Sequence, residues 1–285
     1  MKKTLPGMFC ILFMQTALVA GEGIRLNARF LPGQHYEIIQ TNRITQEISF
    51  QADEETMEQM AAMGLGEGTL IETIMSYKVD LKTGQADHKE GLPLVIHFRE
   101  METISSMNGM EMPSMAPELG QTVVYGRSGD GLKIHIDSIG GLSMDQQIIS
   151  MLEQMTGMML QGLEFPDHKI RPGESFQQSI PMDFPVMGGM PIQVNTVNSY
   201  RLKKVEKPLA YFDLVQTSET HIDSPSGPMT AKGMGSGEMV FNLSAGFLHS
   251  LQIDTQTQMS METPEFDMLI NMHQLSETRV SLSGE

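Results

Sequence analysis

A period-two alternation of apolar and polar residues is the feature that most restricts the fold of this chain. Every second position of residues 92–98 carries a large apolar side chain, from Leu92 to Phe98. The same alternation recurs from Ile192 to Leu202, where Thr196 and Asn198 are its uncharged polar members. Such alternation is typical of β-strands with one buried face. Turn residues separate the runs, for example at Lys207-Pro208 and Ser244-Ala245-Gly246. Because few helix-length segments lie between them, the runs predict antiparallel hairpins rather than crossover units. We therefore expect a mainly β (α+β) protein with curved antiparallel sheets.

Two segments break this alternation and predict helices. Residues 143–161 begin with a capping box, Ser143 and Gln146, and then carry apolar residues three or four positions apart. Residues 53–63 carry Met57, Met60 and Met63 at three-residue spacing and predict a shorter helix, which Gly64 and Gly66 would end.

Three sequence elements recur in the same order in the two parts of the chain. Leu31-Pro32-Gly33 is echoed by Arg171-Pro172-Gly173, and Ser76-Tyr77-Lys78-Val79 by Ser199-Tyr200-Arg201-Leu202. The third element is a pair of strands around a glycine-containing turn. These echoes predict two related β-rich halves. The expected organisation is a signal peptide at 1–20, a first half at 21–142, a connecting helix at 143–164 and a second half at 165–285.

The first 20 residues are typical of a secretory signal peptide: two lysines, an apolar stretch and a small residue, Ala20, at the end. We expect an exported, periplasmic or otherwise extracytoplasmic protein. The cysteine, Cys10, lies within the predicted signal peptide and follows the bulky Phe9, so lipid anchoring there is not expected. No later segment approaches the ~18 apolar residues of a spanning helix.

The net charge of the chain argues against two classes of binding partner. Removal of residues 1–20 takes away two lysines and no acidic residue, which changes the net charge from −16 to −18. Proteins that bind nucleic acid or anionic membranes need clustered Lys and Arg. We therefore expect neither partner class.

Methionine is abundant, with 27 residues in the chain. One set of four lies on the apolar stripe of the predicted helix 143–161: Met151, Met155, Met158 and Met159. This stripe either packs in the core or lines a cavity for varied hydrophobic ligands, since methionine side chains adapt to different shapes. These four residues are our candidate ligand-binding set.

A second methionine cluster, in the segment Met107–Met115, is a candidate Cu(I) site. Thioethers are soft ligands suited to Cu(I), and several of them on a flexible loop could surround the ion. The alternative is that they are adaptable apolar side chains. The candidate ligands are Met107, Met110, Met112 and Met115.

Catalytic motifs are not found. The eight histidines are scattered, and no G-x-S-x-G, H-E-x-x-H or S-x-x-K motif occurs. The run Gly233-Met234-Gly235-Ser236-Gly237 lacks the Lys and Ser/Thr of a phosphate loop and is interpreted as a flexible hairpin connection. We expect no enzyme activity and no cofactor. Aromatic girdles are also missing, which argues against a transmembrane barrel.

Several of these segments together resemble a family of exported, Met-rich, β-rich bacterial proteins of unknown function. The resemblance is carried by Phe30–Tyr36, the Met-rich residues 101–115, the helix at 143–161, Phe165-Pro166-Asp167 and Arg171–Phe176. It covers most of the chain and implies no particular functional residue. The predicted sheet and helix are also similar in outline to periplasmic lipoprotein carriers, whose curved sheet shelters acyl chains.

The sequence thus predicts a non-enzymatic envelope protein that binds a hydrophobic or lipid-like ligand. The first alternative is a structural or interaction module that contacts an envelope protein without a small ligand. The second alternative is Cu(I) handling through the Met-rich loop.

Overall fold

Antiparallel strands make up almost all of the structure, a computed structural model that describes residues 23–62, 68–85, 91–113, 122–129, 132–140, 164–185, 191–224 and 227–282. The first six strands are β1 (His35–Ala52), β2 (Thr69–Thr83), β3 (Leu92–Met107), β4 (Met110–Met112), β5 (Val123–Ser128) and β6 (Ile134–Gly140). The other six are β7 (Ser175–Pro185), β8 (Pro191–Glu206), β9 (Leu209–Ser224), β10 (Gly227–Asn242), β11 (Phe247–Glu262) and β12 (Phe266–Leu282). The prediction of a mainly β fold with curved antiparallel sheet is confirmed.

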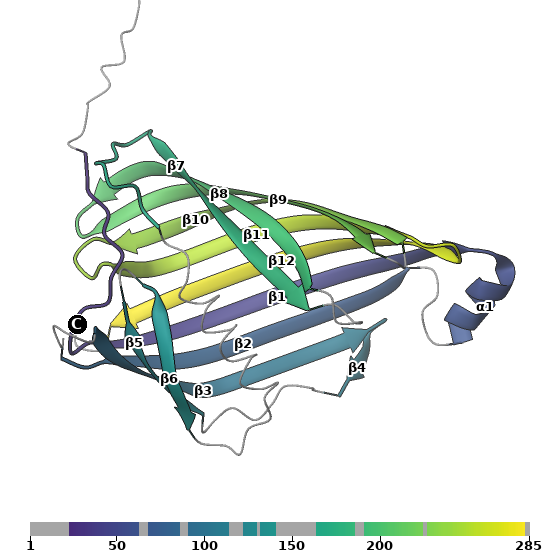
Figure 1. The fold of residues 1–285 in the computed structure, drawn as a ribbon, viewed down its shortest axis with the longest axis horizontal. Coiled ribbons are helices and arrows are strands. Elements are labelled where there is room, and N and C mark those ends of the chain that lie inside the picture. Colours follow the sequence, from purple (N-terminus) through teal and green to yellow (C-terminus); the bar gives the residue numbers. More distant parts are fainter. Residues whose placement is uncertain are drawn as a thin grey trace, which may run out of the picture.

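All twelve of these strands belong to one sheet, in the order β6-β5-β3-β2-β1-β12-β11-β10-β9-β8-β7, with β4 paired to β3. Figure 1 shows the sheet curling, with its long strands drawing together at the end next to the helix. Most neighbours in the sheet are also neighbours in the chain, as expected for hairpins. The exceptions are the pairing of β3 with β5, which flank β4 in the chain, and that of β1 with β12, which joins the two ends of the described chain from Tyr36↔Leu282 to Ala52↔Phe266.

The short helix predicted at 53–63 is confirmed as α1 (Glu54–Ala62). The Asp53 side chain caps it, because its Oδ1 accepts a hydrogen bond from the Thr56 amide at 2.8 Å. This bond lowers the pKa of Asp53. The longer helix predicted at 143–161 lies wholly within residues 141–163, which are outside the described part, and so does the connecting segment 143–164 except for its last residue.

Strands from both predicted halves share this sheet, and the two Pro-Gly turns make matching backbone bonds. Gly33 N donates to Gly84 O at 3.0 Å, and Gly173 N donates to Leu202 O at 2.7 Å. Both glycines have positive φ values, 69° and 93°, which favour glycine. Each turn leads into a strand two residues later. Duplication itself, with halves at 21–142 and 165–285, stays a prediction.

One interpretation of the sequence was wrong. The run Gly233–Gly237 is not a hairpin connection but lies within β10, paired on both sides. Its three glycines occupy one face of the strand, where an added Cβ would come within 2.0–2.7 Å of atoms of β9 or β11. Glycine is required there because the neighbouring strands and side chains leave no room for a side chain.

The core lies at the end of the sheet opposite α1. Its side chains come from one face of the strands, which we call the inner face. They include five fully buried residues: Tyr36, Val79, Leu202, Phe212 and Phe241. Residues 23–34 cross the strand ends here (Figure 1) and bury Leu26, Ala28 and Phe30. This segment is fixed by reciprocal backbone bonds between Ile24 and Ile170 of 2.9 and 2.8 Å.

Candidate functional site

The inner face of the sheet is uncharged along its whole described length. Pairing registers place Asp, Glu, Lys, Arg and His of the described strands either on the opposite, outer face or at β-bulges. Arg99 and Lys203, for example, are the extra residues of bulges in β3 and β8. The many acidic residues of the strands are therefore gathered on the outer face.

Three zones follow one another along the inner face, starting from the core end. The first is the buried apolar core described above. The second is a row in which seven of nine positions carry Ser, Thr, Asn or Gln, and the third, next to α1, is rich in methionine. The change from apolar to polar and back to apolar is clearest along β1, β11 and β12.

The second zone, which we call the polar row, crosses nine neighbouring strands at one register level. From β3 to β7 its members are Ser105, Thr73, Ile44, Gln274, Thr255, Gly235, Gln216, Asn198 and Gln178. Gln216 lies at the centre of its hydrogen bonds: its Nε2 donates to Asn198 Oδ1 at 3.0 Å, and its Oε1 accepts from Thr255 Oγ1 at 3.1 Å. Gln216 on β9 reaches Thr255 on β11 across Gly235 of β10, where an added Cβ would lie 2.7 Å from Thr255 Oγ1. Glycine at position 235 thus keeps this bond open.

The third zone, which we call the methionine zone, covers the inner face between the polar row and α1. Its members are Ile48, Phe50, Met229, Met259, Met261, Met268, Ile270 and Met272. All eight are half-buried rather than buried. At the strand ends a pocket of about 510 Å³ is lined by Phe50, Met261 and Met268, together with Met57 of α1 and residues of the outer face. This zone offers a broad, adaptable apolar surface.

The candidate residues from the sequence lie elsewhere or outside the described part. Met151, Met155, Met158 and Met159 belong to the undescribed segment 141–163, so their role as ligand-binding residues stays a prediction. The methionine zone was missed, although its signal was present. Met259, Met261, Met268, Ile270 and Met272 all fall on alternate positions of two runs that were recognisable as strands.

The proposed Cu(I) ligands are only partly described. Met107 and Met110 do not lie on an open loop: they are cross-strand partners in the β3–β4 hairpin, and Met112 pairs with Ser105. The turn residues Asn108 and Gly109 have positive φ values, which suit a tight two-residue turn. Met115 is outside the described residues. Copper binding stays a prediction. The described residues hold no cluster of three or more His, Cys, Asp or Glu that could bind a metal ion.

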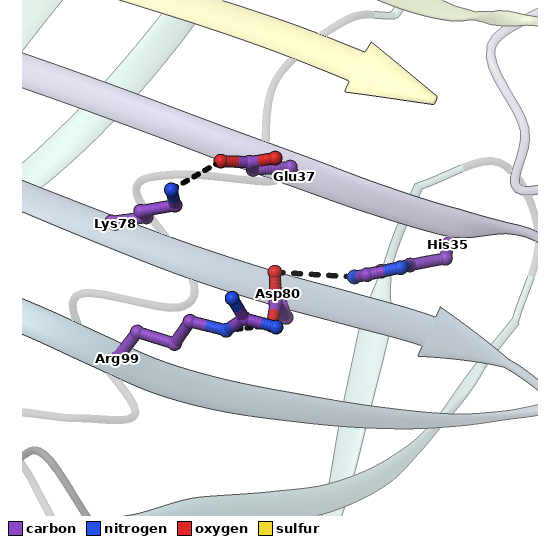
Figure 2. Close-up of polar contacts among 5 residues, drawn as sticks. All are labelled: His35, Glu37, Lys78, Asp80 and Arg99. Atoms are coloured by element: carbon purple, nitrogen blue, oxygen red, sulfur yellow. Dashed lines mark ion pairs between the residues drawn. The ribbon is translucent and has the colours of Figure 1, made fainter. Parts of the chain in front are cut away.

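A charged cluster lies on the outer face, over β1, β2 and β3 (Figure 2). Asp80 is its centre, with a side chain only 4% exposed. Its Oδ1 faces His35 Nε2 at 3.1 Å, and its Oδ2 pairs with Arg99 Nε. A second pair, Lys78 with Glu37 at 2.5 Å, lies beside it, and the hydrogen bond that Lys78 Nζ donates to the Glu37 carboxylate raises the pKa of Lys78. The Asp80 carboxylate therefore ties the bulge of β3 to β1 and β2.

The outer face also carries a hollow of about 710 Å³ over β1, β2 and β10–β12. It is lined mainly by polar residues, among them Thr45, Lys232, Gln256 and His273, and by Met234. Met234 is 71% exposed and points away from the inner face. This makes Met234 a natural control position for the methionine zone.

Two tyrosines at the boundary between the core and the polar row predict a loss of stability at alkaline pH. Burial raises the pKa of Tyr200 to about 12 and also raises the pKa of Tyr77. In the unfolded chain a tyrosine ionises near pH 10, so above that pH the unfolded state releases protons that the folded state retains. The stabilising contribution is present below about pH 10 and is lost as the pH rises towards about 12. We expect the free energy of unfolding of a Tyr77→Phe/Tyr200→Phe variant, measured in urea, to fall less steeply over this pH range than that of the wild type. An equally steep fall would show that other groups cause it.

Comparisons with known proteins give a structural likeness only. No family model and no curated protein matches the chain. A solved structure described as lipid–protein interactions in lipovitellin matches with a TM-score of 0.48 and 9% sequence identity. The match covers 90% of this chain and 26% of the solved chain. Our chain therefore spans about a quarter of that chain's length. Within the described residues, no helix is long and apolar enough to cross a membrane.

Proposed function

We propose that this protein binds a hydrophobic or lipid-like ligand on the methionine zone, without catalysing a reaction, in the periplasm or another extracytoplasmic compartment. The observation that carries the proposal is the uncharged inner face, whose third zone stays half-buried in the described structure. Apolar side chains that stay half-buried at the end of a sheet, outside the close-packed core, leave apolar surface that a ligand can cover. The signal-like residues 1–20 support export.

Methionine suits such a surface for a physical reason. Its side chain is unbranched, flexible and polarisable, so neighbouring methionines can adjust to ligands that differ in shape. Met259 and Met261 on β11, with Met268 and Met272 on β12, form two adjacent methionine-bearing strands. They lie at the open end of the sheet and not in the close-packed core, where such adjustment would leave cavities.

The first test is native mass spectrometry of the mature protein purified gently from the compartment to which it is exported. An adduct with the mass of a lipid supports the proposal. Binding is then measured with purified protein and methyl oleate, by displacement of a hydrophobic fluorescent probe. A bare mass combined with no binding of methyl oleate contradicts the proposal. That result would favour the interaction module, for which the hollow on the outer face is the available surface.

A charge placed on the methionine zone is expected to weaken binding. Met259→Glu introduces a carboxylate into an uncharged surface. When an apolar chain covers this carboxylate, the group must either stay hydrated or become protonated, and both weaken binding. We expect the Kd for methyl oleate to rise at least about tenfold, a difference of about 1.4 kcal/mol.

Met234→Glu is the matched control for this variant. It adds the same charge to the same sheet, but on the outer face, and should leave the Kd unchanged. Equal effects of the two variants would show that the inner face is not where the ligand binds. Thermal unfolding of both variants verifies that they are folded.

A further inference from the structure

One member of the polar row has an unmet hydrogen-bonding requirement. Gln178 lies on β7 opposite Asn198 of β8, on the inner face, and is 9% exposed. Its Oε1 is buried without a hydrogen-bond partner in the described structure. Buried polar atoms are nearly always paired, and an unpaired one destabilises a protein. A hydrogen-bond donor to Gln178 Oε1 must therefore come from outside the described residues.

The neighbours of Gln178 in the row do not supply this donor. Asn198 Nδ2 donates to Tyr200 OH at 3.4 Å, and its Oδ1 accepts from Gln216 Nε2. Gln216 is held in turn by Thr255. The row thus forms a chain of side-chain hydrogen bonds from β11 to β8 and stops one strand short of Gln178.

Resting on the proposed function, we infer that the ligand is an amphiphile with an uncharged head that donates a hydrogen bond to Gln178. The head lies at the β7 end of the polar row, and the apolar chain extends over the methionine zone. An uncharged head is required because the paired inner-face positions of the described strands offer no cation to an anionic group. Hydroxyl-bearing heads, such as that of a monoacylglycerol, meet both conditions.

The dimensions of the inner face suit an acyl chain. From Ile44 in the polar row to Phe50 in the methionine zone, β1 rises about 20 Å at about 3.3 Å per residue. One leaflet of a bilayer accommodates its acyl chains in about 15 Å, half of the hydrocarbon core. A chain whose head is at Gln178 on β7 must also cross three strands, about 14 Å at about 4.8 Å per strand, to reach Met229 on β10, so it runs diagonally over the strands towards the end of the sheet next to α1.

The test compares three ligands that share one acyl chain: monoolein, methyl oleate and oleate. Monoolein has hydroxyl donors, methyl oleate has none, and oleate is anionic when ionised. We expect the wild type to bind monoolein about tenfold more tightly than methyl oleate, as one additional hydrogen bond to a buried group allows. Oleate, measured at a pH where it is ionised, should bind more weakly than monoolein.

Gln178→Leu is the informative variant, since it removes the unpaired oxygen but keeps a side chain of similar size. It should bind methyl oleate like the wild type and lose the preference for monoolein. Gln177→Leu is the matched control: Gln177 is the next residue, exposed on the outer face, where its Nε2 donates to Ser199 Oγ at 3.3 Å. This control should keep the preference.

The outcomes separate this inference from the proposed function. Equal binding of monoolein and methyl oleate, or an unchanged preference in Gln178→Leu, overturns the inference about the head while the binding function stands. Tighter binding of oleate than of monoolein overturns the requirement for an uncharged head. If none of the three ligands binds, both the inference and the proposed function fail.

Discussion

A Phe212→Ala variant is expected to lower the free energy of unfolding by about 3–5 kcal/mol, which is the usual loss for a fully buried phenylalanine. Phe212 is 0% exposed on β9, and its register partners on the inner face are Leu202 and Met239, which are also buried. The Phe176 ring lies 6.1 Å from it in an edge-to-face contact. Because strands hold these neighbours in place, they cannot collapse into the vacated volume, and a cavity remains.

Urea unfolding followed by circular dichroism measures this loss. Phe50→Ala is the comparison at the other end of the sheet, where the ring is half-buried and contacts Phe266 at 5.9 Å between centroids. We expect the Phe50→Ala loss to be less than half that of Phe212→Ala. Similar losses would mean that the methionine zone is as tightly packed as the core, which would contradict its role as an adaptable surface.

The second large effect is expected at Gly237 in β10. A Cβ at this position would lie 2.0 Å from the backbone oxygen of Gln252 and 3.0 Å from the Ile253 Cα on the adjacent β11. Backbone atoms cannot rotate away as a side chain can, so the two strands would have to separate. We expect Gly237→Ala to destabilise the protein by about 3 kcal/mol, the upper part of the range for overpacking.

Gly140→Ala is the matched control, because Gly140 also lies in a strand, β6. The nearest atom to its added Cβ would be Tyr125 Cε2 at 3.6 Å, an ordinary contact distance. Its unfolding free energy should change by less than about 1 kcal/mol, consistent with the modest effect of glycine replacement where space allows. A Gly237→Ala variant as stable as Gly140→Ala would show that β10 and β11 are not held as close as described.

The strands and the short helix α1 could be predicted because their signals are local. The alternation through Leu94, Ile96 and Phe98 reflects burial of one face, and Asp53 with the methionine spacing after it marks a helix. Gly233–Gly237 misled the prediction for the same reason. Glycine is usually a local sign of a turn. Here Gly235 is needed because it leaves space for the hydrogen bond between Gln216 and Thr255 on the two neighbouring strands.

The candidate site could be predicted only in part, because a face of a sheet is defined by its partners. The methionines of β11 and β12 were visible in the sequence, but nothing local shows that they join Met229 and Phe50 on one surface. The polar row is a stronger example. Its members come from nine strands, and only the pairing registers place Gln178, Asn198 and Gln216 side by side.

The pairing of β1 with β12 has a consequence for the order of folding. Gln46 and Met272 contact each other although they lie 226 positions apart in the chain, and closing so long a loop is entropically unfavourable and slow. Until residues 266–282 are available, β1–β3 and β8–β11 can form only as two separate stacks of hairpins. β12, which follows the other described strands in the chain, is therefore the strand that unites them, and both stacks expose apolar inner faces until it pairs. A chain of this design has reason to be kept from aggregating by a binding partner until β12 has been made.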